Sequence, residues 1–212
     1  MVDTVLLSSL IGFAFIGSIT PGPNNLMVMA SAAAFGWRRA VPHMLGIMFG
    51  FGIMLALVTS GLGALILEVP VLLDVVKFGG AAWLLWLAFK MARGALQPSD
   101  PTAPDQPSSK ARPLTMLEAM LFQWVNPKGW AMALACAGAY VELAPSVITR
   151  AALIALVFMA MTPFANGTWM AAGEAMHRLF TGPRAGKIFG LGMAFLIAAT
   201  AVMIVLGPSG LP

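Results

Sequence analysis

Two proline-containing polar motifs interrupt long apolar stretches of this sequence, and they carry the residues best suited to chemistry. The first motif holds Pro21, Gly22, Pro23, Asn24 and Asn25, and the second holds Gln123, Asn126, Pro127 and Lys128. Proline lacks a backbone donor and stops a helix, so the helix that follows begins with free N–H groups. Free N–H groups at a helix start favour anions, and amides and an ammonium add further donors. The two motifs therefore predict a site for a carboxylate-bearing molecule.

Lys128 strengthens this prediction because it lies deep in its apolar stretch. It is roughly a dozen residues from either end, and a cation at such depth costs at least ~2.5 kcal/mol. The ammonium should therefore face a cavity and meet a partner. It either pairs only with half-helix carbonyls, or binds a substrate carboxylate or carries a proton; we favour the functional role. For each proline motif the simpler alternative is a packed kink without a ligand.

One more polar residue is a weaker candidate for the same site. Asn166 interrupts the apolar stretch 147–173, close to Thr162, Pro163 and Thr168. Helix packing alone also accounts for small polar residues of this kind. We therefore include Asn166 among the predicted substrate-binding residues without assigning it a specific role.

The composition requires that these motifs lie in a membrane. Hydrophobic residues make up 59% of the 212 residues and charged residues only 9%, and the mean hydropathy is +0.88. A soluble domain carries roughly 25% charged residues. Cys136 is the only cysteine, which excludes a disulfide scaffold. The excess of four positive charges is too small to indicate nucleic-acid binding. The sequence indicates an integral membrane protein in contact with the lipid bilayer.

Six apolar stretches are long enough to span a bilayer as helices, which takes about 20 residues. They cover residues 4–34, 41–67, 72–91, 115–139, 147–173 and 186–206. The N-terminus lacks a basic region ahead of its apolar run, so we expect the first stretch to be retained rather than cleaved. Residues 94–113 are rich in proline, serine and aspartate and predict a disordered linker. The chain then divides into a three-helix unit at 1–93, the linker at 94–113, and a second three-helix unit at 114–212.

The placement of basic residues predicts the orientation in the membrane. Nine lysines and arginines fall in the first, third and fifth loops, against two, Lys77 and Arg150, on the opposite side. Basic loops stay in the cytoplasm. We therefore expect the linker inside the cell and both termini on the non-cytoplasmic side.

An odd number of spans in each half inverts the second half relative to the first. The proline motifs occupy the first helix of each half, which is the arrangement typical of a transporter's midplane site. The predicted fold is an all-α polytopic membrane protein. It has six transmembrane helices in two inverted three-helix repeats, with the first and fourth helices broken at the proline motifs.

The motifs resemble those of the LysE/RhtB family of bacterial amino-acid exporters. The resemblance rests on residues 20–25, on residues 35–40 with Gly46, on residues 78–84, and on the Asn-Pro-Lys element in residues 123–128. Residues 166–169 and 178–180 look most like the cysteine/O-acetylserine exporter branch. Many relatives carry Asp after Pro-Gly-Pro, where this chain has Asn24, so a carboxylate proton carrier is missing at that position.

The resemblance implies a secondary exporter of small amino acids or close derivatives in the bacterial inner membrane. Its expected partners are the amino-acid substrate and protons, exchanged by antiport through alternating access, with no cofactor and no metal. Proton coupling through Lys128, His43, Glu118 or the substrate itself stays open. A homodimer is an option because of glycine-rich helix faces.

Three alternatives to an amino-acid exporter remain. An intramembrane enzyme would need a catalytic set at membrane depth, and the sequence holds no such motif, so we expect no enzyme. Lys128 and the two broken helices argue against a non-transporting accessory subunit. An exporter of a non-amino-acid metabolite would share the predicted fold and differ only in its substrate.

Overall fold

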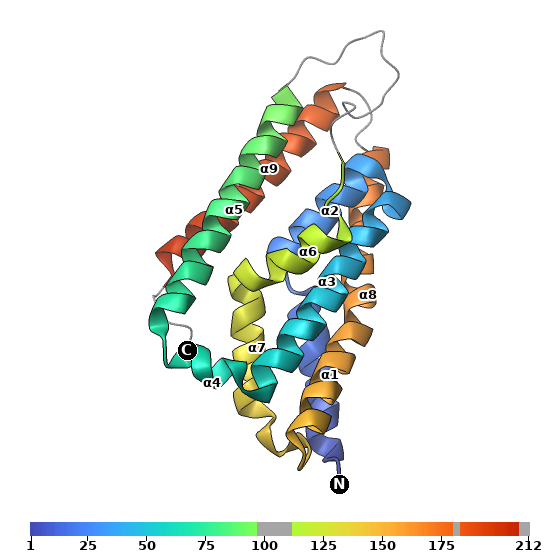
Figure 1. Cartoon of the computed structure of the whole chain (residues 1–212). Coiled ribbons are helices and arrows are strands. Elements are labelled where there is room, and N and C mark those ends of the chain that lie inside the picture. Colours follow the sequence, from blue (N-terminus) through green and yellow to red (C-terminus); the bar gives the residue numbers. More distant parts are fainter. Residues whose placement is uncertain (97–111, 180–182, 208–212) are drawn as a thin grey trace.

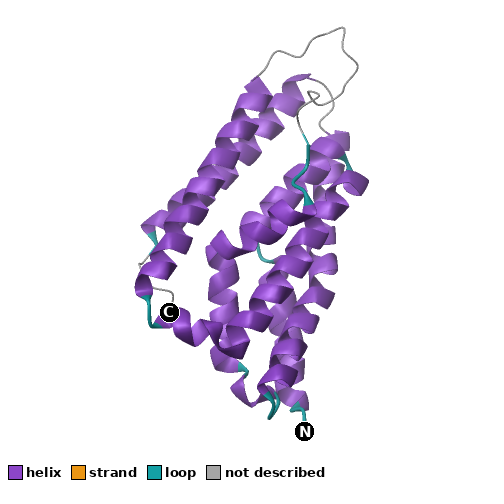
Figure 2. Cartoon of the chain, in the orientation of Figure 1, coloured by secondary structure: helices purple, strands orange, loops and turns teal. Residues whose placement is uncertain are grey.

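The protein is helical throughout the part that the structure describes. A computed structural model describes residues 1–96, 112–179 and 183–207, and no strand occurs in these ranges (Figure 2). The helices, including the short π- and 3₁₀-helices η1 to η3, are α1 (Thr4–Ile19), α2 (Pro23–Phe35), α3 (Trp37–Leu57), η1 (Val58–Leu62), α4 (Gly63–Leu67), α5 (Pro70–Leu96), α6 (Met116–Phe122), η2 (Gln123–Val125), α7 (Pro127–Ala139), η3 (Val141–Leu143), α8 (Val147–Leu179) and α9 (Pro183–Leu206).

Four helical segments are long and apolar enough to cross a membrane, and the pair α1 and α2 would make a fifth span. The four are Trp37–Leu67, Val71–Leu96, Val147–Met176 and Gly186–Leu206. Six spans were predicted from the sequence. The stretch predicted at 115–139 consists of short helices on either side of Asn126. Neither helix is long enough to cross a membrane by itself. An all-α, multi-pass membrane protein is confirmed, and the sixth span stays a prediction.

The boundaries of the helices differ from the predicted ones because apolar residues alone do not mark helix ends. Helix α5 continues to Leu96 and therefore includes the first residues of the predicted linker. The rest of that linker, at 97–111, lies outside the described residues. Helix α8 extends to Leu179, beyond the predicted end at 173. Charged and polar residues at the ends, such as Arg93, continue a helix past the apolar stretch.

The first proline motif separates α1 from α2. Helix α1 ends at Ile19, Gly22 is fully extended with φ −172°, and Pro23 is the first residue of α2. The two helix axes differ by 55°. Proline suits the first helical position because its missing N–H would have no intrahelical acceptor there. The sequence therefore both ends α1 and starts α2 at a fixed place.

The second proline motif separates η2 from α7 in the same manner. Asn126 is extended, with φ −90° and ψ 104°, and Pro127 begins α7. Ahead of this break, α6 is fixed by a capping box in which Thr115 and Glu118 satisfy each other's backbone N–H groups. Both predicted breaks are thus present in the structure.

The helices pack in pairs drawn from the two halves of the chain. Figure 1 shows α5 beside α9, and α3 lies along α8 with α6 across it. Helix α2 also packs on α8, and buried residues of α2, α5, α6 and α9 form one core that joins these pairs: Leu26, Met27, Ala30, Ala81, Leu84, Ala88, Phe122, Met193, Ile197 and Ala201.

Glycines allow the closest of these contacts. A Cβ at Gly46 would collide with the Met116 carbonyl oxygen, and one at Gly50 would lie 2.6 Å from the Met120 Cα atom. Gly190 of α9 is similarly close to Ala95 of α5. These glycines are used between helices of the same chain, so they give no support to the predicted homodimer.

Candidate functional site

The two helix breaks meet at a pocket between the halves of the chain. Its empty volume is about 410 Å³, mouth included. Six of the predicted site residues line it: Gly22, Asn24, Asn25, Asn126, Lys128 and Asn166. The remaining lining residues are Gly17, Ser18, Ile47, Phe51, Gly129, Met132 and Thr162. Elements from both halves of the chain therefore build one cavity.

Two helix N-termini without side-chain caps border this pocket. Neither Gly22, ahead of α2, nor Asn126, ahead of α7, caps its helix with a side-chain hydrogen bond. The first N–H groups of a helix have no intrahelical acceptor, and they lie at the positive end of the helix dipole. The start of each of these helices therefore contributes a positive potential beside the pocket, which suits an anionic group.

Asn25 has a structural task in the break. Its Nδ2 donates to the carbonyl oxygen of Ser18 at 2.9 Å and to that of Thr20 at 2.7 Å. The indole Nε1 of Trp169, from α8, donates to the Ile19 carbonyl oxygen at 3.0 Å. These donors satisfy the carbonyl groups that the end of α1 leaves free. Asn25 thus satisfies the end of α1 with its amide nitrogen and also lines the pocket, and its predicted contact with a substrate stays a prediction.

Lys128 connects the second break to the first. Its Nζ donates to the Thr20 carbonyl oxygen at 2.6 Å and approaches the Pro21 carbonyl oxygen at 3.4 Å. A cation is favoured there because the C-terminal end of α1 carries the negative end of its dipole. Gly22 makes room for the lysine, since a Cβ at that position would lie 2.8 Å from the Lys128 Cδ. Lys128 thus pairs with carbonyl groups and also lines the pocket, so its predicted role toward a substrate or a proton stays a prediction.

Asn24 and Gln123 form a reciprocal amide pair across the two halves. Asn24 Nδ2 donates to Gln123 Oε1 at 2.9 Å, and Gln123 Nε2 donates back to Asn24 Oδ1 at 3.2 Å. Gln123 also donates to the Ala119 carbonyl oxygen at 2.8 Å and is 0% exposed. Gln123 therefore supports Asn24 from beside the pocket and is not among the lining residues, and its predicted part in substrate binding stays a prediction.

Two amide groups in the lining lack a partner. Asn126 Oδ1 and Asn166 Nδ2 are buried without a hydrogen bond, and each residue is only 2% exposed. An unpaired buried polar atom costs about 1–3 kcal/mol. The acceptor of Asn126 and the donor of Asn166 thus stand ready for a ligand that offers the opposite groups. Thr162, one turn before Asn166, is satisfied by the Phe158 carbonyl oxygen at 2.8 Å.

The remaining predicted residues shape the site without lining it. Pro21, Pro23 and Pro127 end or begin the helices. The apolar walls, Ile47, Phe51 and Met132, were missed because apolar residues in an apolar chain carry no distinguishing signal. Thr162 could have been found from its spacing of four residues from Asn166. Within the described ranges, no three His, Cys, Asp or Glu side chains are placed to hold a metal ion.

Comparisons with known proteins identify the family of this chain. The family model described as LysE type translocator matches residues 15–208. A cysteine/O-acetylserine efflux protein of Escherichia coli (strain K12) is 27% identical over 199 residues, covering 94% of this chain and 97% of that protein. A protein of the same name from Shigella flexneri is 26% identical over 200 residues, with the same shares covered. No solved structure matches the chain significantly. The chain belongs to the LysE family of translocators and is a transporter, not an enzyme.

Proposed function

We propose that this protein is a secondary active exporter of small amino acids or close derivatives in the bacterial inner membrane. The observation that carries the proposal is the pocket at the two helix breaks, bordered by two uncapped helix N-termini and Lys128. Membership of the LysE family and the efflux relatives support export as the direction of transport. Cysteine and O-acetylserine, named for those relatives, are the first substrates to test.

The substrate carboxylate meets the free N–H groups of a broken helix and the ammonium of Lys128. An ammonium has three donors, and the α1 carbonyl groups use two of them. The third donor remains for a carboxylate, and hydrogen bonds between charged groups are the stronger ones. Lys128 thereby binds the substrate and the end of α1 at the same time.

The unpaired amides recognise the rest of the substrate. An α-ammonium group, which only donates, fits Asn126 Oδ1, and a polar acceptor on the substrate fits Asn166 Nδ2. Apolar side chains of Ile47, Phe51 and Met132 complete the wall against a short substrate side chain. This set of groups favours a zwitterion with a small uncharged side chain.

The arrangement of the halves supports alternating access. The pairs α5 with α9 and α3 with α8 join corresponding helices of the two units, which supports six spans in an inverted repeat. The substrate site lies between the units, so rocking one against the other would expose it to each side in turn. Protons moving inward would drive export by antiport.

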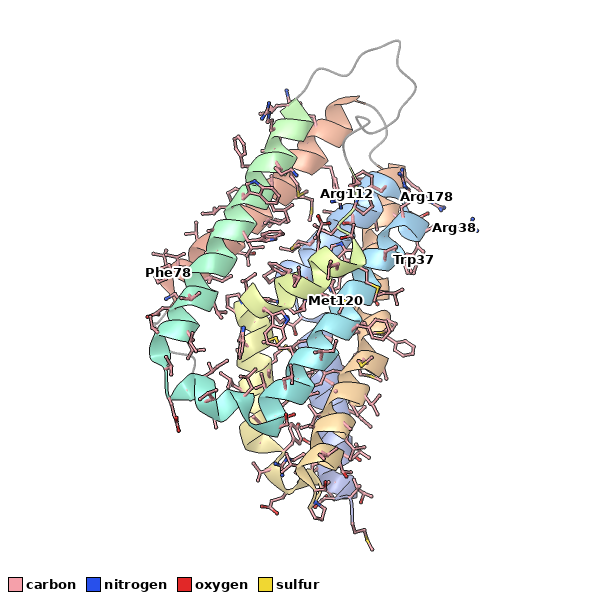
Figure 3. The ribbon with its side chains drawn as sticks, in the orientation of Figure 1. Trp37, Arg38, Phe78, Arg112, Met120 and Arg178 are labelled. Carbon is pink, nitrogen blue, oxygen red and sulfur yellow. The ribbon has the colours of Figure 1, made fainter. Side chains whose placement is uncertain are left out.

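The orientation follows from the basic end of the molecule. Figure 3 shows Arg38, Arg112 and Arg178 at the same end, where α2, α5 and α8 finish. Basic loops stay in the cytoplasm. This end therefore faces the cytoplasm, and the start of α1 and the end of α9 face the outside.

Efflux from preloaded cells tests the function and names the substrate. Cells that overexpress the protein are compared with empty-vector cells for efflux of labelled cysteine, O-acetylserine, threonine, homoserine, leucine and lysine, with and without a protonophore. We expect faster, protonophore-sensitive efflux of one or more small neutral substrates. If no substrate leaves faster although the protein is in the membrane, amino-acid export is wrong, and an accessory subunit or another metabolite replaces it.

A further inference from the structure

A buried histidine–serine pair lies outside the pocket and has no place in the recognition just described. Ser31 Oγ on α2 and His43 Nδ1 on α3 are 2.9 Å apart. His43 is 1% exposed and Ser31 is 8% exposed. The second ring nitrogen, Nε2, is buried without any hydrogen-bond partner. His43 is thus an ionisable side chain whose Nδ1 is hydrogen-bonded to Ser31 and whose Nε2 has no hydrogen-bond partner.

Either tautomer leaves Nε2 in need of a partner. If Nδ1–H donates to Ser31 Oγ, Nε2 has a buried, unused lone pair that can accept a proton. If Ser31 donates to Nδ1, Nε2 carries a buried N–H without an acceptor. When His43 is charged, both nitrogens donate and Ser31 Oγ accepts from Nδ1–H. The serine therefore positions the ring in every protonation state.

The pair lies on the same faces of α2 and α3 as residues that line the pocket, but beyond the pocket itself. His43, Ile47 and Phe51 follow one another at spacings of four residues, which places them along one face of α3. Ile47 and Phe51 line the pocket, so His43 lies one turn beyond it. On α2, Ser31 is seven residues after Asn24, which also lines the pocket, and so lies on the same face. A change in the packing of α2 on α3 therefore affects both the pocket and the pair.

The acidic side chains of α6 and α8, the helices that pack against α3, already have partners, and the arginines at the start of α3 lie in solvent. Glu118 of α6 accepts two hydrogen bonds from Arg112, at 2.6 and 2.7 Å. Glu174 of α8 pairs with Arg178 at 2.7 Å. Helix α2 contains no charged residue. Arg38 and Arg39, at the start of α3, are exposed. No carboxylate among the described residues therefore ties up Nε2.

We propose that His43 Nε2 is the site that binds the transported proton, an inference that rests on the proposed antiport. In the outward-facing state, a proton from the outside adds to the Nε2 lone pair and gives an imidazolium. The protonated, substrate-free protein returns to the inward-facing state, where the proton leaves to the cytoplasm. Substrate then binds to the neutral form and is carried out. Proton and substrate bind at different sites. Binding of one disfavours binding of the other, because both sites depend on the packing of α2 on α3.

Purified protein in liposomes separates this inference from the proposed function. Exchange of labelled external cysteine, kept reduced, for unlabelled internal cysteine at equal pH needs only the substrate-bound half of the cycle. Net uptake of labelled cysteine into empty liposomes with an acidic interior needs the proton-bound half. The variants are His43→Gln, which cannot be protonated, and His177→Gln, which removes the chain's only other histidine.

We expect His43→Gln to keep exchange within about twofold of the original protein and to lose net uptake down to the level of protein-free liposomes. His177→Gln should keep both activities. Net uptake by an exchanging His43→Gln variant, or equal loss in both variants, would overturn the assignment. Absence of exchange in the original protein would instead defeat the proposed function.

Ser31→Ala gives a second test that keeps the imidazole. Without the serine oxygen the charged ring loses its acceptor, so net uptake should require a more acidic interior, while exchange at neutral pH persists. A purely structural role of the pair would lower both activities together and leave the pH dependence unchanged, which would contradict the proposal. Exchange activity also shows that each variant is folded.

Discussion

The ammonium of Lys128 lies 2.6 Å from the carbonyl oxygen of Thr20, so the second proline break supplies the cation that closes the end of the first. These residues are 108 positions apart in the chain. Their contact makes the two breaks a single structural unit at the pocket. Any ligand that draws Lys128 away from Thr20 frees the end of α1, which links binding to the relative position of the two halves.

Gly22→Ala should reduce export without unfolding the protein. The added Cβ would lie 2.8 Å from the Lys128 Cδ, and the lysine side chain is flexible enough to move aside. The ammonium then leaves its place at the pocket. We expect export to fall by about tenfold, the effect of losing one charge-assisted hydrogen bond. Gly12→Ala is the matched control, because nothing lies within 4 Å of its Cβ. Equal efflux from both variants, at equal protein levels, would contradict the role of Gly22.

Asn166→Leu should make the protein more stable and less active. The leucine removes a buried Nδ2 that has no hydrogen-bond partner, so the free energy of unfolding should rise by roughly 1–3 kcal/mol. It also removes the donor proposed for the substrate. Thermal unfolding in detergent should shift upward while efflux falls. Thr168→Val, an exposed position on the same helix, should change neither. A stabilised variant with full efflux would exclude Asn166 from recognition.

Gly80→Ala should destabilise the packing of α5 on the second break. A Cβ at Gly80 would collide with the backbone oxygen of Val125, which cannot move independently of η2. We expect a loss of about 1–3 kcal/mol, typical of overpacking. Gly79→Ala is the control, since its Cβ would have only an ordinary contact with Val125 at 4.0 Å. Equal melting temperatures of the two variants would show that α5 does not depend on this contact.

Competition should distinguish substrates by charge. Among the described residues that line the pocket, Lys128 is the one charged residue, and no carboxylate among them would meet a second cation. A lysine substrate would place like charges close together, so it should bind about tenfold or more weakly than cysteine. Inhibition of labelled cysteine exchange by unlabelled amino acids measures this ratio. Equally strong inhibition by lysine would mean that the substrate side chain lies outside the described pocket.

The sequence predicted the breaks because proline acts locally. Pro21, Pro23 and Pro127 fix their own backbone and that of their neighbours, whatever the rest of the chain does. The pairing of Asn24 with Gln123 could not be predicted, because two amides anywhere in the chain form the same bonds and only tertiary packing brings these two together. The role of Asn25 at the end of α1 depends likewise on the 55° bend.

The helix count was the least predictable feature of the fold. An apolar window at 115–139 is long enough for a span, and the break at Asn126 divides it into two short helices, so the sixth span stays a prediction. Hydropathy cannot distinguish these arrangements, since both contain the same apolar residues. Ser31 could not be predicted from the sequence as the partner of His43, because the hydroxyl of a serine in a helix more often bonds to the backbone of its own helix.

Efflux by Lys128→Ala measures whether the two helix breaks build the transport site. Cells preloaded with the labelled substrate are compared for the original protein, Lys128→Ala and Lys77→Ala, with the amount of each protein in the membrane measured. Lys77 also donates to a backbone carbonyl oxygen, that of Gly207 at 2.6 Å, but lies outside the pocket. We predict that Lys128→Ala loses export to the level of empty-vector cells and that Lys77→Ala keeps it. Full export by a membrane-inserted Lys128→Ala variant would contradict a transport site built on the two helix breaks.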